Sequence, residues 1–344
     1  MILTLEQFAQ EQRAGMPPVV EGVPLEGQVI ALTGANTGIE YEAAKHFAQR
    51  KPHKLILVCR NELKAWCLGL KTETGFQNVE VWAVDFSSFE SVKAVKTKIA
   101  ELERLDILVE NAGVAMYGYE VTKDGWETTL QVNVLSCAMH IILHLPKMFQ
   151  TANEHPETVP RIVVVSSDTH HWGKISAEAM KAPSMLRCLS DHNPTHFTGD
   201  KMYPEFKILS TMFIRTLQSY LPTITCCVVN PGFCHSGLTR HAPEAVAERF
   251  RKEKQLLAYT PEEGSRQLIY AAIGQRERED ELRGSYVSFS RVSECSDFIL
   301  GNEGRALERK LWEEATKVVS GADEHTGDIV ERYASLNEGR TLLL

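Results

Sequence analysis

Short apolar runs and longer amphipathic segments alternate along most of the chain. Seven runs rich in β-branched residues and bounded by turn-forming residues are QVIALTG, KLILVCR, VEVWAVD, LDILVEN, RIVVVSS, TITCCVVNPG and GSYVSFS. Segments of helical length lie between most of them, at 38–49, 63–74, 88–102, 125–149, 201–220 and 261–273. Strands without polar alternation, separated by helices, are typical of a parallel sheet covered on both faces. The pattern therefore predicts a single doubly wound α/β Rossmann domain with a seven-stranded parallel sheet.

Extensions and two inserts surround or interrupt this alternation. We expect an N-terminal extension at 1–26, the Rossmann domain at 27–290 and a C-terminal helical extension at 291–344. Inside the domain, 168–200 and 233–259 break the rhythm, and we expect these inserts to form the substrate side. Apolar side chains there could line a pocket or simply pack the inserts onto the domain; they are Met180, Met185, Leu186, Phe197, Leu238, Val246 and Phe250.

Composition narrows the functional classes. The net charge of −8 argues against a nucleic-acid-binding protein. The longest apolar stretch, 138–145, is too short for an integral membrane segment, and the N-terminus does not resemble a signal peptide. The eight cysteines form no CxxC pair, and the histidines of 168–200 lack metal-ligand spacing. We therefore expect a cytoplasmic protein with reduced thiols and no metal site.

A glycine-rich turn follows the first predicted strand and opens the first helix of the domain. Small residues allow the backbone to approach a diphosphate, and the helix N-terminus supplies N–H donors and positive potential. A simple strand-to-helix connector is the alternative. The residues that we expect near the phosphates are Gly34, Asn36, Thr37, Gly38 and Ile39.

The ends of the second and third predicted strands bear on the choice of cofactor. Arg60 stands where a fold that prefers NAD usually has an acid, and its guanidinium suits the 2′-phosphate of NADP. A solvated arginine is an equally good interpretation. Asp85, which precedes Phe86, could bond the adenine amino group or cap the next helix. The balance favours NADP(H) over NAD(H).

One residue interrupts the glycine pattern. Glu40 stands two residues after Gly38, where a third small residue would be expected. A carboxylate in the first turn of a helix suits the macrodipole but competes with a bound phosphate. Its effect depends on the direction of the side chain, and we expect the harmless orientation.

Tyr203 and Lys207 are candidates for acid/base chemistry. Their spacing of four puts a phenol and an ammonium on one face of a helix, although such pairs are common by chance. A tyrosine needs a nearby positive charge to exchange protons at neutral pH, and Lys207 could supply it. Pro204 predicts that the helix begins here, because proline suits the first turn.

Polar and small residues at other strand ends complete this candidate site. Ser167 ends the fifth strand, where its hydroxyl could bond a substrate oxygen or cap a turn. Asn111, Ala112 and Gly113 end the fourth strand, where small residues would let a ring lie against the backbone. Asn133 could hold a water that links Lys207 to solvent, or could have a structural role.

Together these motifs resemble the classical short-chain dehydrogenases/reductases over 27–290. TGANTGI, VDFSS, ENAG, VNV, VVSS, YPEFK and NPGFCHSGL occur in that family's order. RIVVVSSDTHHWGK is similar to the retinol dehydrogenase-like branch, and NPGFCHS and SDFILGNEG are similar to fungal secondary-metabolism members. The resemblance implies the catalytic residues Asn133, Ser167, Tyr203 and Lys207. It implies cofactor contacts from Gly34, Asn36, Thr37, Gly38, Ile39, Arg60, Asp85, Phe86, Asn111, Ala112, Gly113, Tyr203, Lys207, Pro231 and Ser236.

We therefore predict an NADP(H)-dependent oxidoreductase that interconverts a carbonyl and an alcohol on an apolar small molecule. Tyr203 would be the acid/base, Lys207 would lower its pKa and Ser167 would polarise the carbonyl. The alternative is a non-redox cyclase, isomerase or epimerase that uses Tyr203, with cofactor binding altered by Glu40. The resemblance also allows a homodimer through helices beside the site, unless the terminal extensions block it.

Overall fold

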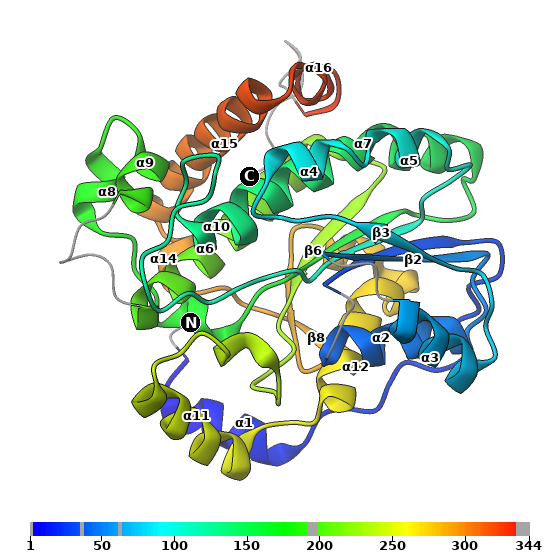
Figure 1. Ribbon diagram of the computed structural model, residues 1–344, viewed down its shortest axis with the longest axis horizontal. Coiled ribbons are helices and arrows are strands. Elements are labelled where there is room, and N and C mark those ends of the chain that lie inside the picture. The colour runs from blue at the N-terminus through cyan, green and yellow to red at the C-terminus, as the bar shows by residue number, and fades with distance from the viewer. Residues whose placement is uncertain (1–2, 35–37, 61–63, 192–198, 335–344) are drawn as a thin grey trace.

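The computed structural model describes residues 3–34, 38–60, 64–191 and 199–334, and its helices cover both faces of a central sheet (Figure 1). In this part of the chain the strands form one eight-stranded sheet in the order β3-β2-β1-β4-β5-β6-β7-β8. Their bounds are β1 Val29–Thr33, β2 Lys54–Cys59, β3 Val79–Ala83, β4 Ile107–Glu110, β5 Arg161–Val165, β6 Thr225–Val229, β7 Tyr286–Ser288 and β8 Arg291–Ser293. Strands β1 to β7 are parallel, so the predicted doubly wound parallel sheet is confirmed.

The sheet has one strand more than the sequence pattern predicts. Strand β8 pairs antiparallel with β7 across a tight turn in which Phe289 and Ser290 have a φ of 53°. It is only three residues long and largely exposed, so it lacks the apolar run by which the other strands were recognised. The sheet thus continues past residue 290, where sequence analysis ends the Rossmann domain.

Two apolar cores separate the sheet from its helical layers. Alternate residues of a strand point to opposite faces, so Ile30 and Leu32 of β1 lie in one core while Val29 and Ala31 lie in the other. Helices α2 Ile39–Gln49, α3 Lys64–Thr74 and α12 Pro261–Ile273 cover the first face (Figure 1). The second face is covered by α4 Phe89–Lys93, α5 Lys96–Ala100, α7 Ser136–Glu154 and α10 Gly199–Tyr220. The remaining internal helices are α6 Thr128–Leu130, η1 Gln131–Leu135, η2 Asp168–His171, α8 Ala177–Lys181, α9 Met185–Ser190, η3 Gly237–Thr239, α11 Glu244–Leu257, η4 Arg276–Arg278 and α13 Glu279–Leu282.

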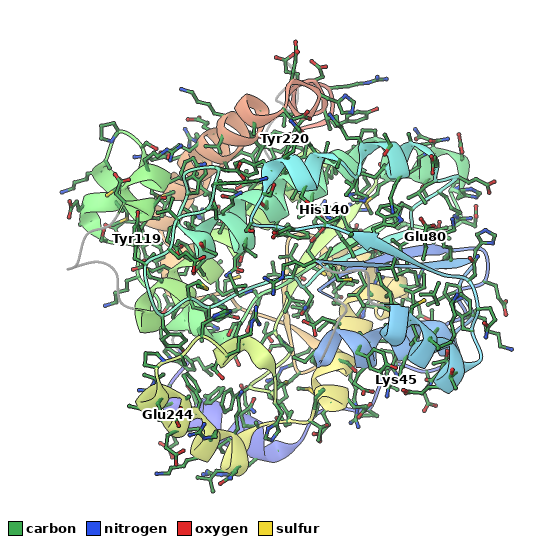
Figure 2. All side chains as sticks on the ribbon, viewed as in Figure 1. Lys45, Glu80, Tyr119, His140, Tyr220 and Glu244 are labelled. Carbon is green, nitrogen blue, oxygen red and sulfur yellow. The ribbon has the colours of Figure 1, made fainter. Side chains whose placement is uncertain are left out.

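The C-terminal helices α14 Asp297–Leu300, α15 Asn302–Ala322 and α16 Glu324–Tyr333 add a third layer outside α7 and α10 (Figure 1). Trp312 of α15 stacks against Phe213 and Tyr220 of α10, with ring centroids 5.2 and 4.9 Å apart. Tyr220 is labelled beside these helices in Figure 2. An ion pair of 2.7 Å joins Arg215 to the buried carboxylate of Glu308. The C-terminal extension is therefore an integral layer of the fold.

The first insert mostly packs against this layer. Met185 and Leu186 are fully buried in the core, and Met180 packs against it. The backbone N–H groups of Met185 and Leu186 each donate to the Glu314 carboxylate of α15 at 2.9 Å. These apolar side chains thus take the packing role that sequence analysis left open, and Phe197 lies outside the described residues.

Candidate active site

A cavity of about 1530 Å³ runs along the edge of the sheet where the parallel strands end. Polar and small residues that follow neighbouring strands meet there because parallel strands end on the same edge. The predicted site residues that line the cavity are Gly34, Ile39, Arg60, Asp85, Phe86, Asn111, Ala112, Gly113, Ser167, Tyr203, Lys207, Pro231 and Ser236. Gly38 and Asn133 do not line it, and Asn36 and Thr37 lie outside the described residues.

Gly34 brings the glycine-rich turn into close contact with the end of β4. Its φ is 82°, and a Cβ at this position would lie 3.1 to 3.2 Å from atoms of Asn111 and Ala112. The preceding Thr33 hydroxyl oxygen accepts from the backbone N–H groups of Asn111 and Ala112 at 2.9 and 3.0 Å. That hydroxyl also donates to the buried Glu110 carboxylate at 3.1 Å. A larger side chain at Gly34 would therefore disturb the junction that shapes this end of the cavity.

The N-terminus of α2 lies at the same end of the cavity as Gly34. Gly38 is its N-cap and supplies no side-chain hydrogen bond, which leaves the first turn suited to an anion. Glu40 lines the cavity, and its carboxylate accepts a hydrogen bond from the Asn111 side-chain amide. Burial raises the pKa of Glu40 to about 7, against the opposing effects of hydrogen bonds and of the Arg240 charge. The side chain thus points into the crevice toward Asn111, and its effect on a bound phosphate stays a prediction.

Two guanidinium groups reach the cavity beyond the end of β2. Arg60 is exposed, and Arg240 comes from the loop after β6. Burial lowers the pKa of Arg240, the positive charge of Arg60 lowers it further, and Glu40 opposes the shift. Because nearby charges shift the pKa of a group, these opposing effects indicate that Arg60 and Glu40 both lie near Arg240. Sequence analysis did not identify Arg240, because it lies two residues beyond the NPGFCHSGL motif and no local pattern there indicates an anion site.

Asp85 lies in a turn at the end of β3. Its carboxylate accepts from the Ser87 backbone N–H and hydroxyl at 2.9 and 2.7 Å. Helix α4 is capped instead by Ser88, whose hydroxyl oxygen accepts from the Ser91 N–H at 3.1 Å. The capping role considered for Asp85 is therefore wrong, and its carboxylate faces the cavity from an Asx-type turn.

Tyr203 and Lys207 enter the other end of the cavity from α10. The Lys207 Nζ donates to the Val165 carbonyl at 2.6 Å and lies 5.3 Å from the centroid of the Tyr203 ring. Burial lowers the pKa of Lys207 to about 8. Burial also raises the pKa of Tyr203, and the phenol of Tyr117 adds to this shift. The Lys207 ammonium is bonded to the Val165 carbonyl, and its lowering of the Tyr203 pKa stays a prediction.

Helix α10 begins earlier than the proline predicted. It starts at Gly199, so Pro204 lies inside the helix and Tyr203 is not at its entrance. Gly173 makes room for this part of the helix, since a Cβ there would lie 2.9 Å from the Pro204 carbonyl carbon. Residues 172–174, which line the cavity, are thereby held beside Tyr203.

The two serines at the end of β5 have different surroundings. Ser166 is buried, and its hydroxyl lies 2.9 Å from the Thr211 hydroxyl of α10. Ser167 is half-buried and lines the cavity, while its hydroxyl oxygen accepts from the Thr169 N–H at 3.2 Å. Ser166 thus fastens the strand to α10, and Ser167 both caps a turn and faces the cavity.

Asn133 lies in the π-helical turn η1 with its side chain turned to the loop after β4. Its Oδ1 accepts from the Val114 N–H at 2.9 Å, and its Nδ2 donates to the Val114 carbonyl at 2.8 Å. The same amide oxygen would lie 3.2 Å from a Cβ at Gly113. The side chain therefore has the structural role considered for it, fixing the turn that contains Gly113.

Comparison with known proteins places this geometry in a family. Residues 28–179 match the family model described as short chain dehydrogenase. A short chain dehydrogenase/reductase of Cryptosporiopsis sp. is 31% identical over 85% of this chain and 90% of its own. A short chain dehydrogenase of Emericella nidulans is 34% identical over 82% of this chain and 90% of its own. The chain belongs to the short-chain dehydrogenase/reductase family.

A solved structure agrees with this assignment at the level of the fold. An uncharacterized protein from Mycobacterium Paratuberculosis has a TM-score of 0.62 and 20% identity, and the match covers 89% of this chain and 96% of that one. The predicted resemblance to short-chain dehydrogenases/reductases and to fungal members is thus confirmed. Members of this oxidoreductase family bind nicotinamide cofactors, and the cradle at Gly34 and the α2 N-terminus fit the diphosphate of such a cofactor.

Sequence analysis missed one wall of the cavity in this short-chain dehydrogenase/reductase. Helix α1 Leu5–Ala14, from the N-terminal extension, contributes Leu5, Phe8 and Ala9 to the lining. Its alternation of apolar and polar residues indicates an amphipathic helix but gives no sign of the surface that it covers. Of the apolar residues proposed in the second insert, Leu238 and Phe250 line the cavity, whereas Val246 does not.

Asp168 and Tyr286 form a second pair that sequence analysis missed. The Tyr286 hydroxyl donates to the Asp168 carboxylate at 2.5 Å, and burial raises the pKa of Asp168 to about 6. His170, one of the histidines of 168–200, is buried, and its Nε2 accepts from the Ser296 N–H at 3.3 Å. Within the described ranges, no group of three or more His, Cys, Asp or Glu side chains could hold a metal ion.

The helical stretch Thr128–Glu154 is long and apolar enough to cross a membrane by length and composition. However, 83% of its most apolar window is buried within the fold. His140, labelled near the centre of Figure 2, belongs to this stretch and lies 2.5 Å from the Glu110 carboxylate. The apolar side chains therefore belong to the core, which accounts for the composition of this helix.

Proposed function

We propose that the protein is an NADP(H)-dependent oxidoreductase that interconverts a carbonyl and an alcohol on an apolar small molecule. The observation that carries this proposal is the continuity of one cavity from Gly34 and Asn111 to Ser167, Tyr203 and Lys207. A nicotinamide cofactor bound along it would supply or accept the hydride. The volume of about 1530 Å³ exceeds the roughly 300–1000 Å³ of an ordinary ligand pocket, which supports room for a dinucleotide and a substrate.

The chain's own residues would hold the carbonyl and move the proton. In the reducing direction, the carbonyl carbon receives the hydride while the Tyr203 phenol gives its proton to the carbonyl oxygen. Lys207 would lower the pKa of Tyr203 so that the phenol can exchange this proton near neutral pH. Ser167 would polarise the carbonyl oxygen, and the Lys207 ammonium would lie beside the cofactor ribose and the phenol. Asn133 would contribute by fixing the turn at Gly113.

Arg60 and Arg240 support NADP(H) as the preferred cofactor. Their charges disfavour one another, and an anion between them would relieve this repulsion. A 2′-phosphate has the charge and the acceptor oxygens that guanidinium groups bind best. The preference would then arise from two neighbouring arginines rather than from Arg60 alone.

Cofactor titrations of an Arg60 variant test this preference. We expect Arg60→Ala to raise the Kd for NADPH by about tenfold and to change the Kd for NADH by less than about twofold. Arg278→Ala removes an exposed arginine that does not line the cavity and serves as the control. An equal loss of affinity for both cofactors would contradict the assignment of Arg60 to the 2′-phosphate.

The reaction type is tested separately by following NADPH absorbance during turnover. Oxidation of NADPH in step with alcohol formation is the expected result. Substrate turnover without any change in NADPH would favour the cyclase, isomerase or epimerase alternative. None of the eight cysteines, all of which lie in the described ranges, forms a disulfide, which supports a cytoplasmic location for the enzyme.

A further inference from the structure

Helix α1, which contributes three residues to the cavity lining, lies beside α11 (Figure 1). The buried side chain of Gln12 donates to the carbonyls of Phe233 and Leu257 at 3.0 and 2.8 Å. Its amide oxygen accepts from the Phe233 N–H at 3.1 Å. The Tyr259 hydroxyl donates to the Glu11 carbonyl at 2.8 Å. Because a buried amide with all these bonds is costly to displace, α1 is a fixed wall of the site.

Four aromatic rings from four separate segments form a continuous row in this wall. Phe8 of α1 meets Trp172 edge to face, with centroids 5.4 Å apart and planes at 86°. On its other side it lies 6.5 Å from Phe233, which lies 6.4 Å from Phe250 of α11. All four residues line the cavity. Without Phe8, Trp172 would be separated from the Phe233–Phe250 pair. Phe8 therefore makes the row continuous.

The row begins beside the helix that carries the proposed acid/base. The Trp172 indole N–H donates to the Leu3 carbonyl at 2.6 Å, which holds the ring against the start of α1. The following residue, Gly173, packs tightly on Pro204, the neighbour of Tyr203 in α10. A ring system that lies along Trp172 and Phe8 would consequently place an attached carbonyl toward Tyr203.

We propose that α1 is a substrate-specificity element and that the aromatic row selects neutral aromatic carbonyl compounds and their alcohols. This inference rests on the proposed carbonyl/alcohol function and deepens it by naming the substrate class. Aromatic rings gain attraction from edge-to-face and offset contacts in addition to the burial of apolar area. Phe8 is the determinant, because it is the ring that connects Trp172 to Phe233.

Phe8→Leu tests the proposal because it keeps an apolar side chain and removes the ring. We compare kcat/KM for β-tetralone with that for β-decalone, a saturated ketone with the same carbon skeleton. The wild-type enzyme should prefer β-tetralone, and Phe8→Leu should reduce that preference by about fivefold through a higher KM. Gln10→Ala, an exposed position on the same helix, should keep the wild-type preference. An unchanged preference in Phe8→Leu would overturn the proposal.

A binding measurement separates this inference from the proposed reaction. β-Naphthol is titrated calorimetrically into wild-type protein and Phe8→Leu protein, after both show the same thermal unfolding transition. We expect binding to the wild type and an approximately fivefold higher Kd for the variant. Equal binding by both proteins, or none by the wild type, overturns the role of α1. A lack of NADPH oxidation with every ketone, together with the expected β-naphthol result, rejects the proposed reaction and retains the aromatic site.

Discussion

The carboxylate of Glu40 lies in the crevice that the cofactor diphosphate would enter, near the first turn of α2. It is held there by the Asn111 amide and by its own backbone N–H, with Arg240 close by. Its pKa of about 7 means that the side chain is mostly neutral below pH 7 and charged above it. The charged form repels a diphosphate, so the affinity for the cofactor should fall as the pH rises through 7.

Glu40→Gln should remove this pH dependence. Between pH 6.5 and 8, we expect the Kd of wild-type protein for NADPH to rise by up to about tenfold relative to that of the variant. Both proteins share every other titrating group, including Lys207, so the ratio of their Kd values isolates Glu40. Fluorescence titrations at several pH values give this ratio. A ratio that does not vary with pH would show that Glu40 does not face the bound phosphates.

The positions of the site residues could be predicted from the sequence, whereas many of their partners could not. Strand ends fix where Asn111 and Ser167 lie, because each directly follows a buried run. The bond from Lys207 to the Val165 carbonyl depends on how closely α10 packs on β5. The proximity of Arg240 to Arg60 depends on the path of a long insert. Neither the contact of Lys207 with Val165 nor the proximity of Arg240 to Arg60 can therefore be predicted from a local sequence pattern.

Among the helices and strands, periodicity predicted the long buried elements well and the short or irregular ones poorly. The expected helix at 261–273 agrees with α12, which has a capping box at Thr260 and Pro261 in its first turn. The start of α10 was misplaced because Pro204 was interpreted as a first-turn residue. The role of α1 was missed because amphipathicity does not identify the surface that a helix covers.

Helix α15 offers a test at the same scale. Trp312→Ala would remove the ring that stacks on Phe213 and Tyr220, and large-to-small changes of this kind cost roughly 3–5 kcal/mol. We expect the free energy of unfolding, measured with urea, to fall by about that amount. Arg305→Ala, at an exposed position of the same helix, should change it by less than about 0.5 kcal/mol. A small effect of Trp312→Ala would mean that α15 is only loosely attached.

For the molecule as a whole, the C-terminal layer determines which surfaces are available to partners. Helices α15 and α16 bury part of α10 and α7, through contacts such as Phe213 with Trp312 and Phe149 with Tyr333. Helix α10 carries Tyr203 and Lys207 of the candidate site, and the family resemblance allows a homodimer through helices beside that site. The covering layer supports the interpretation that the extension replaces a second subunit at this face.

We therefore expect the protein to be monomeric in solution. Light scattering coupled to size exclusion should give the mass of one chain across a wide range of concentrations. A stable dimer mass throughout that range would contradict this expectation and would require an interface on another face or a displaced α15.

We propose that Tyr203 exchanges the proton during hydride transfer. The most direct measurement compares Tyr203→Phe with wild-type protein in single-turnover oxidation of NADPH by a ketone substrate, alongside NADPH titration of both. We predict that the rate falls by about 100- to 10,000-fold while the Kd for NADPH stays within about twofold. A variant that turns over at the wild-type rate with normal NADPH affinity would contradict the account.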